Sequence, residues 1–186
     1  MKWNLDDLYL GFDDPKYKSD FDKLSLLIDK YNEIPNLINK EDELTVILKY
    51  IELSQQLVIL VRTLSSFNSL TNATDVSNQE SLVNMARLSR MLNETTTTDV
   101  LFTRFLKEVD LNKYLDNEII KDNLFQLEKN QKSAKHLLSE KEEVLYSKLR
   151  QVASNSWGQI QSLLTSKLDV SVGDKTLTLP EVRNLA

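Results

Sequence analysis

The sequence predicts a mainly α-helical protein of long antiparallel helices, arranged as helical hairpins or a bundle, with one small β-hairpin near the C-terminus. Three observations predict this class. The 186 residues include three glycines and three prolines, well below average usage, so tight turns are few. Apolar residues recur at spacings of three and four, as on one face of a helix. The residue composition changes after Lys167, where β-branched residues flank a Gly-Asp pair, a pattern typical of a β-hairpin.

The first long helix is predicted to begin at Pro15. Asp14 can cap it, and proline suits the first helical position because its missing N–H would have no partner there. Pro35 is expected to end this helix. Its apolar face has spacings of four, three, four and three: Tyr17, Phe21, Leu24, Ile28 and Tyr31.

A second helix is predicted over about residues 41–71, with apolar positions on more than one stripe, so we expect it to pack on two sides. A third helical segment is predicted to start near Thr74-Asp75. The run Thr95–Thr98 interrupts it with four mediocre helix formers. Either the helix continues through this run, or Thr98 and Asp99 cap a new helix, and the residues do not choose between the two. The apolar face before the run is Leu82, Met85, Leu88 and Leu92.

After a short turn or helix at residues 111–115, a helix is predicted from Glu118 to about His136. We expect five of its residues to point inward: Ile119, Ile120, Leu124, Phe125 and Leu127. Ser139 and Glu142 form a capping box that starts another helix. A break is expected near Asn155-Ser156, before a short helix that carries Trp157. This tryptophan is predicted to be buried, with a cost of roughly 3–5 kcal/mol for Trp157→Ala.

The hairpin is predicted at about residues 169–179, and Thr178 with Glu181 forms a second capping box that announces a helix. Few residues follow this start signal, which indicates either a short terminal helix or, as we expect, an N-terminal part of a longer polypeptide. The predicted organisation is an N-terminal helical lobe at residues 1–110, followed at residues 111–186 by a helical segment, the hairpin and the start of a truncated helix.

Composition excludes several classes of function. With no cysteine, the chain has no disulfide scaffold and no thiolate metal site. A net charge of -5 argues against a general nucleic-acid binder. The N-terminus lacks an apolar signal segment. The longest apolar run, residues 57–61, is far shorter than the ~20 residues of a membrane helix. We therefore expect a cytoplasmic protein with neither nucleic acid nor membrane among its partners.

Catalytic chemistry finds little support in the residues. His136 is the single histidine, whereas a zinc metallopeptidase with a His-Glu-x-x-His motif needs two histidines on one helical turn. Ser133 and Ser139 flank His136, but no nucleophile elbow occurs. Adjacent acids at 6–7, 13–14 and 142–143 are expected to be caps or solvated residues. We assign no catalytic, cofactor-binding or metal residue.

Three stretches resemble the oligoendopeptidase F family, which comprises zinc metallopeptidases of the thimet-oligopeptidase type. Residues 3–9 resemble its Trp-x-Leu-x-x-Leu-Tyr opening, and residues 136–145 resemble its His-x-Leu-Ser-x-x-x-Glu segment. Residues 156–168, with Val170, Gly173-Asp174-Lys175 and residues 179–185, are similar to the segment that follows. No single motif is specific, but their order and spacing along the chain carry the resemblance.

The resemblance implies a cytoplasmic, mostly helical enzyme that cleaves short peptides inside a deep channel, with its zinc in a C-terminal catalytic domain. This chain would then be the N-terminal helical lobe, part of the channel wall, inactive alone and without a cofactor of its own. Its partner would be the catalytic domain of the same polypeptide. The alternative is a free-standing helical interaction or regulatory module. An exposed apolar surface near the hairpin is expected for the lobe and not for the module.

Overall fold

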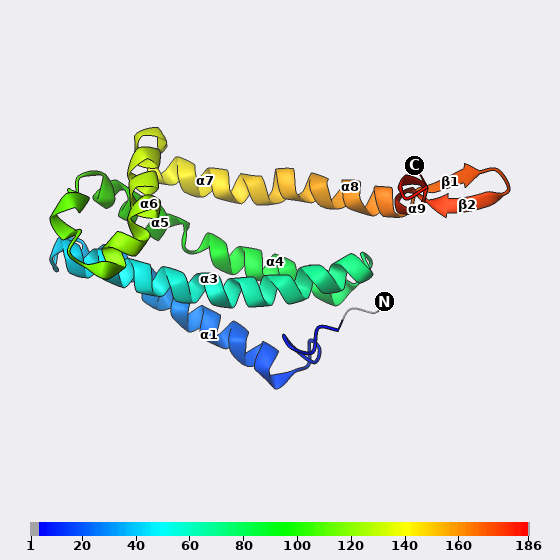
Figure 1. The fold of residues 1–186 in the computed structure, drawn as a ribbon, viewed down its shortest axis with the longest axis horizontal. Helices are drawn as coiled ribbons and strands as arrows, with labels where there is room; N and C mark the ends of the chain where they lie inside the picture. The colour runs from blue at the N-terminus through cyan, green and yellow to red at the C-terminus, as the bar shows by residue number, and fades with distance from the viewer. Residues whose placement is uncertain (1–3, 186) are drawn as a thin grey trace.

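The structure is a computed structural model that describes residues 4–185, apart from the side chains of Gln151, Asn155 and Pro180. Trp3, the first residue of the N-terminal motif, lies outside the described residues. The described chain is mainly helical with one two-stranded antiparallel sheet, so the predicted fold class is confirmed. Figure 1 shows a body of packed helices and a long helical rod that runs beside it toward the hairpin.

The body begins with a helical hairpin. Helix α1 (Pro15–Asn32) starts as predicted, because the Asp14 carboxylate accepts a hydrogen bond from the Lys16 backbone N–H (2.8 Å). Pro35 lies in the first turn of the short helix α2 (Ile34–Leu37). Helix α3 (Glu43–Thr74) is capped by Asp42 and returns along α1. All five residues of the predicted α1 face are buried.

Helix α4 (Gln79–Asn93) starts a few residues later than expected, because the Asn78 side chain caps it at Ser81 N–H (2.8 Å). The chain then breaks at Glu94 and Thr95, and α5 (Thr96–Lys107) contains the other three threonines of the run. Thr98 and Asp99 therefore lie inside α5 and do not cap it. Thr98 is instead buried, and its hydroxyl donates to Asn32 Oδ1 of α1 (2.7 Å).

A 3-10 turn, η1 (Leu111–Tyr114), leads to α6 (Glu118–Ser133), which the 3-10 turn η2 (Ala134–His136) extends. Ile120 and Leu127 are buried as predicted. The inward placement of Ile119 and Phe125 is wrong, because these side chains are 50% and 79% exposed. α6 buries a narrower stripe than its apolar content suggests. The division of the chain after residue 110 stays a prediction.

The rod consists of α7 (Glu140–Arg150), the π-helical turn η3 (Gln151–Asn155) and α8 (Ser156–Ser166). We call residues 140–166 the arm. The expected break near Asn155-Ser156 is wrong, because the helical backbone continues through η3 (Figure 1). The buried placement of Trp157 is also wrong, since its side chain is 71% exposed.

Beyond the arm, β1 (Asp169–Val172) pairs with β2 (Lys175–Thr178) as the predicted hairpin. Gly173 occupies the turn at φ 61°, a conformation that glycine adopts without steric cost. Helix α9 (Leu179–Arg183) follows, and the Thr178 backbone N–H donates to the Glu181 carboxylate (2.7 Å), as expected of the second capping box.

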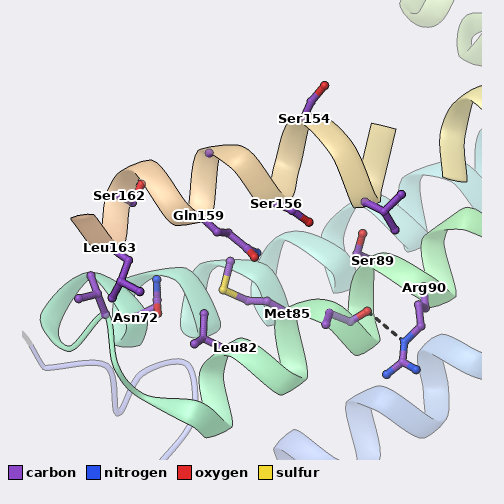
Figure 2. Close-up of a pocket in the computed structure, with 14 residues that line it drawn as sticks. Asn72, Leu82, Met85, Ser89, Arg90, Ser154, Ser156, Gln159, Ser162 and Leu163 are labelled. Carbon is purple, nitrogen blue, oxygen red and sulfur yellow. Dashed lines mark hydrogen bonds between the residues drawn. The ribbon is translucent and has the colours of Figure 1, made fainter. Parts of the chain in front are cut away.

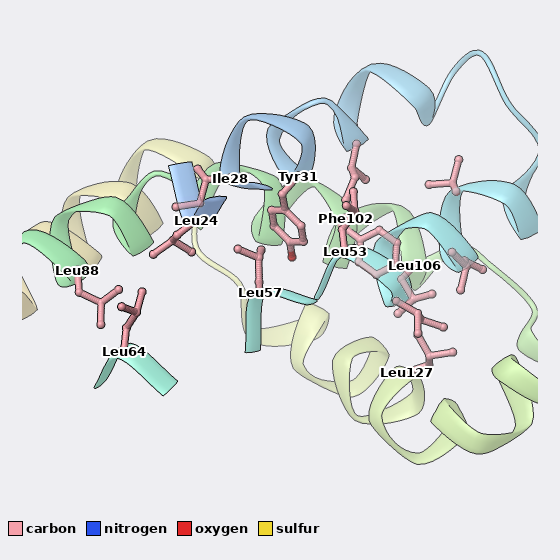
Figure 3. Close-up of a cluster of buried hydrophobic side chains, with 14 of the residues drawn as sticks. Leu24, Ile28, Tyr31, Leu53, Leu57, Leu64, Leu88, Phe102, Leu106 and Leu127 are labelled. Carbon is pink, nitrogen blue, oxygen red and sulfur yellow. The ribbon is translucent and has the colours of Figure 1, made fainter. Parts of the chain in front are cut away.

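The hydrophobic core lies between α1, α3, α4, α5 and α6 (Figure 3). Leu24 and Ile28 of α1 meet Leu57 and Leu64 of α3, and Phe102 and Leu106 of α5 close the far end. Neither α7 nor α8 contributes a buried side chain among the described residues. The core therefore stabilises the body and leaves the arm with little apolar packing of its own.

Helix α3 is long and apolar enough to cross a membrane by length and composition, with a mean hydropathy of 1.5 over 18 residues. The search for uninterrupted apolar runs in the sequence did not identify this helix as long and apolar, because isolated polar residues such as Lys49 and Glu52 divide its apolar residues. Core helices of soluble proteins show the same composition, and α3 packs against α1 and α4. This single helix is weak support for a membrane span.

Candidate functional site: the arm and its groove

The histidine and the paired acidic residues that were considered as catalytic candidates are exposed or make local contacts. His136 is exposed in η2. Asp13 forms an ion pair with Lys18 (2.8 Å), which lowers the pKa of the Asp13 carboxyl. Glu143 accepts a hydrogen bond from the Leu138 backbone N–H (2.9 Å). Within residues 4–185, no group of three or more histidine, cysteine, aspartate or glutamate side chains is arranged to hold a metal ion.

The residues present do not fit the zinc site that the family resemblance implies. That site needs two histidines on one helical turn, and the chain contains His136 alone. No step of a hydrolytic reaction can therefore be assigned to side chains of this chain through a zinc ion.

The base of the arm is fixed to the body by polar contacts. The predicted capping box is formed, since the Ser139 backbone N–H donates to Glu142 Oε2 (2.9 Å) and the Glu142 N–H donates to Ser139 Oγ (3.4 Å). Hydrogen bonds to its carboxylate from the side chain and the backbone of Ser139 hold the pKa of Glu142 below its usual range. Arg104 of α5 donates to the Leu138 carbonyl (2.7 Å), just before the arm.

About two helical turns after Ser139, Ser147 of α7 joins the arm to the junction between α4 and α5. Its hydroxyl donates to Asn93 Oδ1 (2.9 Å) and accepts from the Thr96 hydroxyl (3.4 Å). The break at Glu94 and Thr95 thus exposes polar groups that the arm uses. Beyond this point α8 packs on η3 and α9, and its side chains are exposed or half-buried.

The arm carries a row of exposed apolar side chains, which we call the arm stripe. Each member is between 46% and 71% exposed. The spacings along the row are four, three, five, three and four. The members are Leu145, Leu149, Val152, Trp157, Ile160 and Leu164.

The π-helical turn explains the spacing of five. Its hydrogen bonds reach five residues along the chain instead of four, so each residue there covers less rotation about the axis. The step from Val152 to Trp157 crosses η3. Trp157 and Ile160 therefore return to the side of the arm that Leu145 and Leu149 occupy. In an uninterrupted α-helix the same residues would lie on a different side.

A groove of about 850 Å³ separates the arm from the body. Figure 2 shows Leu82, Met85 and Asn72 on one wall and Gln159 and Leu163 on the other. Among the described residues that line this groove, Arg90 alone carries a charge. The groove and the arm stripe together leave most of the arm's apolar surface without a partner within the described chain.

By its fold and by this surface, the protein belongs to a class of helical proteins in which a projecting arm exposes an apolar stripe. Residues 106–169 match a family model described as oligopeptidase F, for the N-terminal domain of that peptidase family. The matched segment runs from the end of α5 to the start of β1, so it contains α6 and the whole arm. The match confirms the resemblance over residues 106–169, a segment that is similar to the N-terminal region of the oligopeptidase F type. The comparisons with curated proteins and with solved structures found no match.

Of the arm stripe, the sequence singles out Trp157 and predicts it to be buried, which is wrong because its side chain is 71% exposed. The spacing of five between Val152 and Trp157 was the signal that an α-helical register would not hold through residues 151–155. The groove involves α4 and α8, which are distant in sequence, and no local pattern predicts their approach.

Proposed function

We propose that this domain is the N-terminal helical lobe of an oligopeptidase F-like metallopeptidase and forms part of the wall of the peptide-binding channel. The observation that carries the proposal is the arm stripe, six exposed apolar side chains inside the segment that matches the family. Apolar surface of this extent is stabilised when another domain covers it. In this proposal the covering domain is the zinc-bearing catalytic domain.

The proposal assigns no catalytic residue to this chain. A single histidine cannot supply the two imidazoles of a His-Glu-x-x-His site. Zinc and the water-activating carboxylate would belong to the catalytic domain, and short peptides would be substrates of the two parts together. By the same resemblance we place the enzyme in the cytoplasm.

A peptidase assay tests the proposal. The chain, with zinc added, is incubated with a quenched fluorescent short peptide, alone and with a separately produced zinc-bearing domain of an oligopeptidase F. We expect no turnover from the chain alone and a rise in chelator-sensitive turnover when both parts are present. Turnover by the chain alone that a chelator abolishes would contradict the proposal.

Matched variants test whether the rise in peptidase turnover depends on the arm stripe. Trp157→Lys should abolish the rise in turnover, because a lysine in the arm stripe would have to lose its hydration in the interface. Phe125→Lys changes an equally exposed aromatic side chain on α6 and should leave the rise intact. Equal loss in both variants, or in neither, would show that the arm stripe is not the contact. A chain that never increases turnover and binds other helical proteins would fit a free-standing interaction module.

A further inference from the structure

A second surface, formed by α1 and α3, combines exposed apolar and basic side chains. α1 and α3 pack as a pair, and α4 covers one side of it, where Arg87 lies over the Phe21 ring (4.4 Å) and Leu88 is buried. Another side of the pair is an open groove of about 610 Å³, which we call the α1–α3 groove. Its apolar residues are Leu26, Leu27, Ile59 and Leu60.

Two of these apolar side chains are unusually exposed for leucine and isoleucine. Leu26 is 63% exposed and Ile59 is 68% exposed. They come from different helices and line the same groove, so they form a joined surface and not scattered single residues. Ile59 also contributes to the high hydropathy of α3, which therefore reflects exposed as well as buried apolar residues.

The rim of the α1–α3 groove is basic. Lys16, Lys23 and Lys30 line it at intervals of seven residues along α1, about 10.5 Å apart for each two helical turns. Asp20 is the one acidic residue of the lining, so the lining carries a net charge of +2 in a chain of net charge -5. Asp20 accepts from the Tyr9 hydroxyl (2.9 Å) and forms an ion pair with Lys23 Nζ (2.8 Å). Lys16 Nζ donates to the Leu8 carbonyl (3.1 Å) and lies over the Tyr9 ring (5.2 Å), so Lys30 is the lysine of the row for which the lining supplies no acidic partner.

This combination specifies the shape and charge of an occupant. Two packed helices leave a groove in which a third helix can lie with its apolar face inward. A row of cations at intervals of seven residues matches acidic residues at the same interval on that helix, where they lie along one edge. A bilayer surface would need a convex apolar face, whereas this surface is concave.

We propose that the α1–α3 groove binds an amphipathic helix that carries a row of acidic side chains beside its apolar stripe. The site is separate from the arm stripe, and the proposal does not depend on the proposed function. Leu26 and Ile59 contact the apolar stripe of the bound helix, and Lys16, Lys23 and Lys30 face its acidic edge. The lysines add attraction at long range, so binding is sensitive to salt.

The test uses two designed probe peptides of about three heptads each. Both are amphipathic helices with the same leucine stripe; one has glutamates at intervals of seven beside the stripe, and the other has lysines there. Fluorescence anisotropy measures their binding to the full chain. We expect saturable binding of the glutamate peptide that weakens with added salt, and weaker binding of the lysine peptide. Equal binding of both, or binding of neither, would overturn the proposal.

Variants localise the contact. Ile59→Asp should weaken binding of the glutamate peptide by about tenfold or more, whereas Val83→Asp, at a similarly exposed apolar side chain on α4, should not. Lys30→Glu should weaken the glutamate peptide and strengthen the lysine peptide, whereas Lys121→Glu on α6 should change neither. Circular dichroism confirms that each variant is folded.

Vesicle sedimentation tests whether the α1–α3 groove binds a membrane instead of a helix. Anionic phospholipid vesicles are mixed with the chain and its Ile59→Asp variant at low salt. We expect the chain to stay in the supernatant. Sedimentation with vesicles that Ile59→Asp abolishes would assign this surface to a membrane and overturn the proposal.

Discussion

Asp99 of α5 lies between Tyr31 of α1 and Tyr50 of α3. The Tyr31 hydroxyl donates to its Oδ1, and the Thr95 hydroxyl donates to its Oδ2 (3.2 Å). Burial raises the pKa of Asp99 above its ordinary value, and the hydrogen bonds only partly offset this effect. The unfolded chain therefore releases the Asp99 proton at a lower pH than the folded chain does.

This shift makes a prediction about pH. Above the unfolded pKa of about 3.9, stability contributed by Asp99 falls as pH rises, until the pH passes the raised folded pKa. Asp99→Asn removes this loss, so the variant should gain free energy of unfolding relative to wild type between pH 4 and pH 7. Urea unfolding at several pH values measures the difference.

Other carboxyl groups do not obscure this comparison. The pKa values of Asp14, Asp42 and Asp75 are lowered by hydrogen bonds and act in the opposite direction, but they are common to both proteins. A difference between the variant and wild type that stays constant from pH 4 to pH 7 would show that Asp99 titrates alike in the folded and unfolded chains.

Trp157 and Phe102 give a second prediction at this scale. Phe102 is fully buried and stacks on Tyr50 with a centroid distance of 3.5 Å. Phe102→Ala should therefore lower the free energy of unfolding by about 3–5 kcal/mol. Trp157→Ala should change it by less than about 0.5 kcal/mol, because an exposed side chain loses little on truncation. Urea unfolding of the two variants decides, and a large loss for Trp157→Ala would contradict the exposed arm.

At the scale of elements, the arm begins at a capping box and depends on it. Ser139→Ala removes the hydroxyl that accepts the Glu142 N–H and should cost about 0.5–2 kcal/mol. The loss should appear as faster hydrogen exchange in α7, because few buried contacts support this helix. Ser162→Ala, an exposed serine of α8, is the matched control and should leave exchange in α7 unchanged. Equal exchange in both variants would mean that the cap does not stabilise the arm.

The π-helical turn is the second element with a testable role. Deleting Ala153 shortens the step from Val152 to Trp157 to four residues, the spacing of an uninterrupted α-helix. We expect unchanged helix content by circular dichroism, since the deletion favours regular α-helix. The arm stripe would stay in register, so the rise in peptidase turnover with the zinc-bearing domain should be retained.

The contrasting variant inserts one alanine after Ala153. The insertion rotates α8 by about 100° relative to α7 and divides the arm stripe. Turnover with the zinc-bearing domain should then be lost while helix content is kept. Retained turnover after the insertion would show that the two halves of the stripe do not act as one surface.

Local patterns in the sequence predict the helices of the body, the caps and the hairpin, because Asp14, Ser139 and Gly173 act on their immediate neighbours. They do not predict which apolar side chains are covered. Phe125 and Trp157 stand at helical spacing and remain exposed, since burial depends on whether another element reaches them. The groove between α4 and α8 also depends on how elements distant in sequence approach each other, so local patterns do not predict it. Trp157, a member of the arm stripe, was therefore predicted to be buried although it is exposed.

At the scale of the whole molecule, apolar packing is concentrated in the body. The core is formed by residues of α1 through α6. The arm extends beside α4 (Figure 1), and the side chains of its stripe are exposed. The stripe spans 20 residues, from Leu145 to Leu164, and the 19 steps between its ends correspond to roughly 28 Å of helix. The chain alone should therefore open more readily in the arm than in the body.

Hydrogen exchange of the chain, alone and mixed with the zinc-bearing domain of an oligopeptidase F, tests the central claim most directly. In the chain alone, residues 140–166 should exchange faster than α1 and α3. After mixing, exchange should slow in the arm and in the α4 residues of its groove, and stay unchanged in α1. An arm whose exchange does not slow, or slowing confined to α1 and α3, would contradict a domain that docks through its arm.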